Sequence, residues 1–142
     1  MQRNATAHWS GGIKDGKGTI TTDSSIVVQT PYSFAKRFGD EKGTNPEELI
    51  AAAHAGCFTM ALSGQLASQN LTADSIDTKA AVTLDKTDSG FGITKIHLTV
   101  TAKIPNATPE QFNEAAQNAK KGCPISKLFA NNADITMDAK LA

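Results

Sequence analysis

The sequence has no excess charge of either sign, because 14 Lys and Arg residues balance 14 Asp and Glu residues. This balance removes the attraction on which nucleic-acid and anionic-membrane binders depend, so we expect neither partner. No stretch approaches the roughly 18 consecutive apolar residues of a membrane span, and the first residues lack the apolar run of a signal peptide. We therefore expect a cytoplasmic protein.

Cysteine is also scarce, since Cys57 and Cys123 are the only two. In a compartment that keeps thiols reduced, two such residues are ordinarily inert, buried and small. Repeats, low-complexity tracts and Pro- or Ser-rich linkers are absent as well. We therefore expect a single domain over residues 1–142, long enough to hold a core without disulfides.

The first half of the chain contains strand signals followed by one long helix signal. Short β-prone runs at residues 6–9, 19–21 and 26–28 predict a meander of strands. Asn45, Pro46 and two glutamates then form a helix start, with the helix running to about residue 69. Because this helix is apolar nearly all round and rich in small residues, we expect it to be central and buried on most sides.

The second half predicts a hairpin, two helices and a last strand. Alternating apolar residues at 76–84 and 96–104 flank a turn at 88–90, which indicates a hairpin with one dry face. Helices are expected from residue 108 to 121 and from Pro124 onward, and a strand at 135–138. The fold class is therefore α+β.

The two cysteines differ in their predicted surroundings. If Pro124 opens a short helix, Cys123 is its N-cap, and the unpaired N–H groups there would stabilise a thiolate. Cys57 lies about three turns inside the long helix, where the helix dipole contributes little. Spacing alone therefore favours Cys123 as the more acidic thiol and Cys57 as a buried structural residue, although a cysteine can also precede a proline by chance.

His54 and Arg37 are further candidates. His54 precedes Cys57 by one helical turn, a spacing that suits a base or half of a zinc site, but zinc needs three or four ligands and none follows nearby. We therefore expect no metal and no cofactor. Arg37 is one of only two arginines, and its planar fork could hold a carboxylate while stabilising an anion; alternatively it is a solvated surface residue.

Three segments of the sequence are distinctive: Gly43-Thr44-Asn45-Pro46-Glu47-Glu48-Leu49-Ile50, Ala52-Ala53-His54-Ala55-Gly56-Cys57-Phe58 and Gly122-Cys123-Pro124-Ile125-Ser126. Together they closely resemble the OsmC branch (osmotically inducible protein C) of the OsmC/Ohr family. The resemblance covers nearly the whole chain in order. It implies an OsmC-like fold of antiparallel strands wrapped around a long central apolar helix, in an intertwined homodimer.

The resemblance also implies a thiol peroxidase of oxidative or osmotic stress defence. Such an enzyme reduces organic hydroperoxides, and hydrogen peroxide less well, with a dithiol reductant that is lipoyl-type in some members. Cys57 resembles the peroxidatic cysteine and Cys123 the resolving one, which reverses the ranking from spacing. Glu47 resembles the glutamate that pairs with an arginine beside the reactive thiolate.

The cation beside the thiolate differs between branches of the family. The organic hydroperoxide resistance branch carries an arginine in an early Gly-rich turn, where this chain has Lys14 and Lys17. The OsmC branch has an arginine that matches Arg37, and we follow that branch.

Helix geometry limits how Glu47 and Cys57 could share a site. Ten positions apart on one helix, they are separated by about 15 Å along its axis. The helix must therefore break between them, or Glu47 must come from the partner subunit, and we favour the partner. A non-enzymatic protein that binds an apolar ligand, with structural cysteines, is the alternative function.

Overall fold

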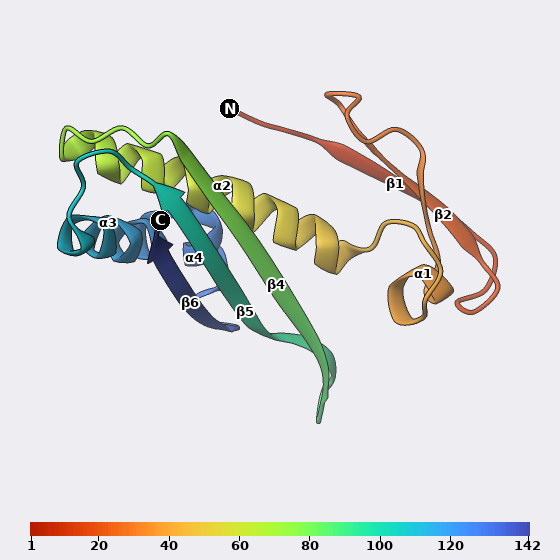
Figure 1. The fold of residues 1–142 in the computed structure, drawn as a ribbon. Helices are drawn as coiled ribbons and strands as arrows, with labels where there is room; N and C mark the ends of the chain where they lie inside the picture. Colours follow the sequence, from red (N-terminus) through yellow and green to blue (C-terminus); the bar gives the residue numbers. More distant parts are fainter. The chain divides into compact units, whose positions relative to one another are not determined.

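The computed structural model describes residues 1–142. The chain divides into two compact units, Met1–Leu49 and Ile50–Ala142, and helix α2 carries the chain from one into the other. Each unit has its own sheet, the first drawn in red and orange and the second in green to blue (Figure 1).

The N-terminal unit is a meander of three antiparallel strands in the order β1-β2-β3, followed by a short helix. Its elements are β1 (Ala5–Ser10), β2 (Lys17–Thr22), β3 (Thr30–Tyr32) and α1 (Phe34–Phe38). Two of the three predicted strands are confirmed, but the prediction of a strand at 26–28 is wrong.

Residues 26–28 form a loop because the backbone turns on both sides of them. Ser25 and Gln29 have φ angles of 58° and 45°, in the left-handed region that interrupts a strand. The loop closes on itself through the Thr22 N–H, which donates to the Val27 carbonyl oxygen at 2.9 Å. The apolar Ile26 therefore lies on the surface with 86% of its area exposed.

Helix α2 (Pro46–Ser68) begins as the sequence predicts. The Glu48 N–H donates to Asn45 Oδ1 at 2.8 Å, so Asn45 caps the first turn. Pro46 occupies the first helical position, where a missing N–H costs nothing. The helix runs unbroken to Ser68 and is followed by Asn70, whose φ of 57° suits a helix end.

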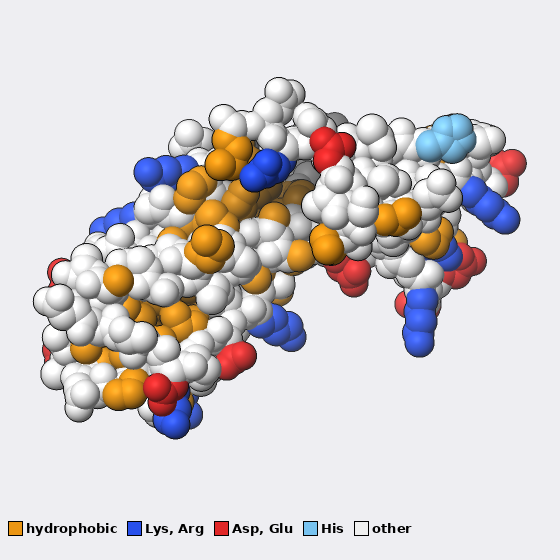
Figure 2. Space-filling view, turned by 90° about the horizontal axis from the view of Figure 1, so that it is seen from above, with side chains coloured by type: hydrophobic (Ala, Val, Ile, Leu, Met, Phe, Trp, Pro, Cys, Tyr) orange, Lys and Arg blue, Asp and Glu red, His pale blue; other side chains and the backbone are white.

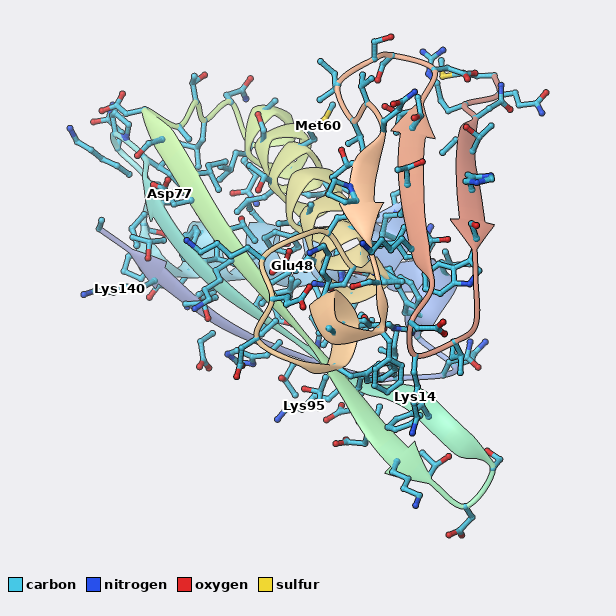
Figure 3. The ribbon with its side chains drawn as sticks, turned by 90° about the vertical axis from the view of Figure 1, so that its right-hand side faces the viewer. Lys14, Glu48, Met60, Asp77, Lys95 and Lys140 are labelled. Atoms are coloured by element: carbon cyan, nitrogen blue, oxygen red, sulfur yellow. The ribbon has the colours of Figure 1, made fainter.

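The burial of α2 differs from the sequence prediction. Only one stripe is buried in this chain, at a spacing of four residues: His54, Phe58, Leu62 and Leu66. Met60 is 78% exposed and projects from α2 on the side away from the β4–β5–β6 sheet (Figure 3). The expectation of burial on most sides was therefore wrong for the single chain.

Helix α2 is also the one helix long and apolar enough, by length and composition, to cross a membrane. The expectation from the sequence did not anticipate this, because His, Gly and Thr residues interrupt its apolar run. A core helix of a globular protein passes the same test. Phe58, Leu62 and Leu66 of its buried stripe belong to such a core.

The C-terminal unit is a three-stranded sheet, β4-β5-β6, with helices on one face (Figure 1). Its elements are β4 (Ser75–Thr87), β5 (Gly90–Lys103), α3 (Pro109–Gly122), α4 (Pro124–Phe129) and β6 (Asp134–Leu141). The predicted hairpin is confirmed, with Gly90 at φ 118° in its turn. The α+β class is confirmed, and both predicted helices are present.

One strand pairing corrects the expectation of antiparallel strands. Strand β6 pairs parallel to β5, because α3 and α4 carry the chain back across the sheet between them. Asp77 and Lys140 are exposed on the face of this sheet away from the helices (Figure 3). The other face forms a core with α2 and α3 that includes Phe58, Leu98 and Phe112.

Candidate active site

Two thiols from distant parts of the sequence meet in the C-terminal unit. Cys57 lies in α2 and Cys123 between α3 and α4, yet their Sγ atoms are 2.9 Å apart. Both cysteines are free thiols, and the Cys123 S–H donates to the Cys57 sulfur. A disulfide bond is about 2.05 Å long, so only a small approach would join them. Cys123 is fully buried, whereas Cys57 is partly exposed.

The surroundings of Cys57 act on its thiol in opposite directions. Burial raises the pKa of Cys57, and negative charge on Cys123 would raise it further because two neighbouring thiolates repel each other. A hydrogen bond from the Ile125 backbone N–H lowers the pKa by stabilising the thiolate. The raising effects are larger, so a thiolate at neutral pH requires a further stabilising charge.

The N–H group at the start of α4 therefore acts on a different sulfur from the one predicted. Cys123 is the N-cap of α4, as expected, but its side chain accepts no capping hydrogen bond. Instead, the Ile125 N–H reaches the sulfur of Cys57 in α2. The sequence prediction considered α4 alone, whereas the acceptor is set by how α4 lies on α2.

His54 makes a contact that the sequence analysis missed. The side chain is fully buried, and its Nε2 lies 2.7 Å from the Ser126 hydroxyl oxygen. Its Nδ1 is buried without a hydrogen-bond partner. Burial lowers the pKa of His54, so the imidazole is neutral at neutral pH. No group of three or more His, Cys, Asp and Glu side chains is arranged to hold a metal ion.

Arg37 and Glu47 form a two-pronged ion pair in the N-terminal unit. Arg37 Nη2 donates to Glu47 Oε1 at 2.7 Å, and Arg37 Nε donates to Oε2 at 3.2 Å. Ser33 caps the short helix that presents Arg37, and the guanidinium lies over the Phe38 ring at 5.2 Å. Glu47 is only 14% exposed, so this geometry fixes the guanidinium more firmly than an open surface contact would.

The two lysines considered as alternative cations lie elsewhere in the same unit. Lys14 is in the turn between β1 and β2 (Figure 3), and Lys17 begins β2. Neither forms an ion pair, and the partner of Glu47 is Arg37.

An apolar pocket of about 280 Å³ lies beside Arg37 within the N-terminal unit. Aromatic rings dominate its lining, and two of them, Trp9 and Tyr32, pack with centroids 5.3 Å apart. Phe34 and Phe38 complete an aromatic wall around the one charged lining residue, Arg37. The pocket therefore combines apolar surface with a single cation.

Comparisons with known proteins show which family this chain belongs to. The family model for OsmC-like protein matches residues 39–138. The chain belongs to the OsmC family, and the thiol pair and the Arg37–Glu47 pair both fall within or beside the matched segment.

Within the family, relatives of both branches match. The chain is 50% identical over 141 residues to Peroxiredoxin OsmC of Escherichia coli K12, covering 99% of this chain and 97% of that protein. It is 34% identical over 125 residues to the organic hydroperoxide resistance protein OhrB of Bacillus subtilis, covering 87% and 89%.

Solved structures agree with the fold. The crystal structure of Bacillus subtilis OhrB matches with a TM-score of 0.71 at 30% identity, covering 96% of this chain and 98% of that one. An OsmC-like protein from Mycoplasma pneumoniae matches with a TM-score of 0.79 at 18% identity, which supports the fold alone.

Proposed function

We propose that the protein is a cysteine-based peroxidase that reduces organic hydroperoxides to alcohols in oxidative and osmotic stress defence. The observation that carries the proposal is the pair of free thiols 2.9 Å apart, one partly exposed and one buried. A solvent-borne peroxide can reach the first, and the second is already in place to react with the product. The relatives named peroxiredoxin and organic hydroperoxide resistance protein support this chemistry.

The first step oxidises Cys57. Its thiolate attacks the distal oxygen of the hydroperoxide, the O–O bond breaks, and the alkoxide leaves as an alcohol after taking a proton. The sulfur, oxidised by two electrons, becomes a sulfenic acid.

The second step joins the two cysteines. The Cys123 sulfur attacks the Cys57 sulfur, the S–O bond breaks, and the hydroxyl leaves as water with the thiol proton. A dithiol then reduces the disulfide by exchange and is itself oxidised to a disulfide. We propose a lipoyl-type dithiol as this reductant on the family resemblance.

Arg37 is proposed as the charge that activates Cys57. A guanidinium near the sulfur would lower its pKa, offsetting the effect of burial. Glu47 would act by orienting the guanidinium, as its two-pronged contact does in the N-terminal unit. The aromatic pocket beside Arg37 suits the organic group of a hydroperoxide, which favours organic substrates over hydrogen peroxide.

The working form is proposed as an intertwined homodimer. Figure 2 shows hydrophobic side chains at the surface of both parts of the chain. The most exposed large ones include Ile26, Met60 and Ile13, at 86%, 78% and 72%. Exposed large apolar side chains of this kind are typical of an interface when they form a patch. An interface along α2 would also cover the apolar surface of this helix. We propose that the chain forms a single OsmC-like domain and that the protein is cytoplasmic.

A turnover assay tests the proposed function. The purified protein is given cumene hydroperoxide or hydrogen peroxide, with either a dihydrolipoyl compound or thioredoxin as electron donor. We expect catalytic loss of cumene hydroperoxide with the dihydrolipoyl compound, and slower loss of hydrogen peroxide. Retention of an apolar ligand with no loss of either peroxide would instead identify a binding protein with structural cysteines.

A further inference from the structure

Helix α2 and the start of α4 are joined at two points in the C-terminal unit. One is the contact between the sulfurs of Cys57 and Cys123, 2.9 Å apart. The other is the hydrogen bond of 2.7 Å between His54 Nε2 and Ser126 Oγ. His54 lies three positions before Cys57, and Ser126 lies three positions after Cys123. The second contact therefore lies about one helical turn from the first.

The second contact is buried, and one of the two ring nitrogens of its histidine has no hydrogen-bond partner. A polar pair kept in such a position indicates a role beyond filling space. His54 is fully buried and Ser126 is 3% exposed. The other ring nitrogen of His54 has no partner, so the imidazole is a costly way to fill this position. The remaining members of the buried stripe of α2 are Phe58, Leu62 and Leu66, all apolar. A leucine at position 54 would continue the stripe without an unpaired polar atom.

The two contacts also respond differently to oxidation. When Cys57 becomes a sulfenic acid, its sulfur carries an added oxygen and no longer accepts the Cys123 S–H as before. The bond between His54 and Ser126 contains no redox-active atom, so the oxidation of Cys57 does not change either of its two groups chemically.

We propose that the hydrogen bond between His54 and Ser126 is a positioning contact that keeps Cys123 against Cys57 while Cys57 is a sulfenic acid. This inference rests on the proposed peroxidase function and assigns to that site two residues that act through others. Cys123 lies three positions before Ser126, so anchoring Ser126 on α2 limits how far the Cys123 sulfur can move away.

The consequence is control over which reaction the sulfenic acid undergoes. With Cys123 in place, the sulfurs join and water leaves. With Cys123 displaced, a second hydroperoxide transfers its distal oxygen to Cys57, an alcohol leaves, and the sulfur is oxidised by two more electrons to a sulfinic acid. The sulfinic acid is outside the reach of a dithiol reductant, so the contact protects the enzyme from inactivation.

The experiment measures this partition in four variants of the full chain: Ser126→Ala, His54→Leu, the double variant, and Thr59→Val as a matched control. Thr59 donates to the Thr78 hydroxyl at 2.8 Å, so its removal breaks another hydrogen bond of α2 that does not reach α4. Each protein is mixed with increasing cumene hydroperoxide. Mass spectrometry then gives the fractions of Cys57 as disulfide and as sulfinic acid, and initial peroxide loss gives the rate of the first step.

We expect Ser126→Ala and His54→Leu each to raise the ratio of sulfinic acid to disulfide about fivefold, the size expected for one lost hydrogen bond. The first step should be unchanged. The double variant should give the same ratio of sulfinic acid to disulfide as either single variant, because each single substitution already removes the contact. Thr59→Val should behave as the parent. If His54→Leu fails to fold, Ser126→Ala alone still gives the ratio.

Two results overturn the inference: an unchanged ratio in Ser126→Ala, or an equal rise in Thr59→Val, which would indicate general loosening of α2. A parent protein that forms no disulfide with peroxide would instead contradict the proposed function itself. The two failures are therefore distinguishable.

Discussion

At the scale of single residues, the chemistry depends on how the surroundings of two neighbouring thiols differ. Cys57 is partly exposed and accepts hydrogen bonds from Cys123 and from the Ile125 N–H, whereas Cys123 is fully buried and donates. Access therefore points to Cys57 as the sulfur that meets peroxide, because Cys123 is closed off from solvent. Burial still raises its pKa, so an added positive charge is the missing requirement.

Replacing Arg37 tests this requirement. If Arg37 stabilises the thiolate, Arg37→Ala raises the pKa of Cys57 further, and each unit of increase lowers the thiolate fraction below the pKa about tenfold. The thiolate is the deprotonated form, so the rise in alkylation rate with pH should move to higher pH. The measurement is the rate of iodoacetamide alkylation against pH, in a Cys123→Ser background.

Arg3→Ala is the matched control, since Arg3 is the only other arginine and lies near the chain start. Its alkylation profile should match that of the parent. An unchanged profile for Arg37→Ala would exclude Arg37 as the activating charge. Lys14→Ala and Lys17→Ala would then identify which lysine, if either, acts instead.

Some residue contacts were within reach of the sequence and others were not. The pairing of Arg37 with Glu47 followed from family resemblance, and the structure contains it. The contact of His54 with Ser126 was missed, although the equal spacing from each to its neighbouring cysteine was a usable signal. The N–H donor to Cys57 could not be found, because it depends on how α4 crosses α2 rather than on either segment alone.

At the scale of elements, α2 shows the largest difference between what local sequence predicts and what tertiary packing determines. Its start, length and end follow from capping and propensity, which are local. Its burial does not, because composition cannot say which apolar face meets the sheet and which is left open. The loop at residues 26–28 is a similar case, since β-prone residues there are overruled by turns on both sides.

Two substitutions on α2 separate the buried face from the open one. Leu62→Ala removes a fully buried side chain and should lower the free energy of unfolding by about 2–5 kcal/mol. Met60→Ala removes a side chain that is 78% exposed, so it should change the stability of the folded chain by less than about 0.5 kcal/mol. Denaturant unfolding at low protein concentration measures both.

Analytical ultracentrifugation gives the second half of this test. If the open face of α2 is the dimer interface, Met60→Ala weakens self-association, although it leaves the unfolding of the separate chain unchanged. Equal unfolding costs for Leu62→Ala and Met60→Ala would contradict the burial pattern described here.

At the scale of the whole molecule, the residues proposed for catalysis are divided between the two units of the chain. Arg37 and Glu47 belong to the N-terminal unit, and the two thiols to the C-terminal unit. Because α2 is unbroken, Glu47 and Cys57 are about 15 Å apart along its axis, beyond the reach of a glutamate side chain. We therefore expect Glu47 to serve the Cys57 of the partner subunit across a symmetric interface.

Mixed dimers test this sharing directly. Subunits carrying Cys57→Ser and Glu47→Ala are co-expressed with different tags, and the mixed dimer is purified. One of its two sites then has an intact Glu47 and an intact Cys57, so activity should return to about half that of the parent, although neither variant homodimer is active. A mixed dimer as inactive as both homodimers would show that Glu47 acts in its own subunit or not at all.

A second mixed dimer, of Cys57→Ser with Cys123→Ser, is the control. The two sulfurs meet within one chain at 2.9 Å, so complementation restores no complete pair. This mixed dimer should consume peroxide without sustained turnover.

The central claim is that Cys57 attacks the peroxide and Cys123 resolves the product, and single-turnover peroxide consumption without reductant tests it most directly. Cys123→Ser should consume about one equivalent of cumene hydroperoxide per chain at the parent rate and stop as a sulfenic acid, because forming that acid needs only the attacking thiolate. Cys57→Ser should consume none. Equal consumption by Cys57→Ser and the parent protein would contradict the account.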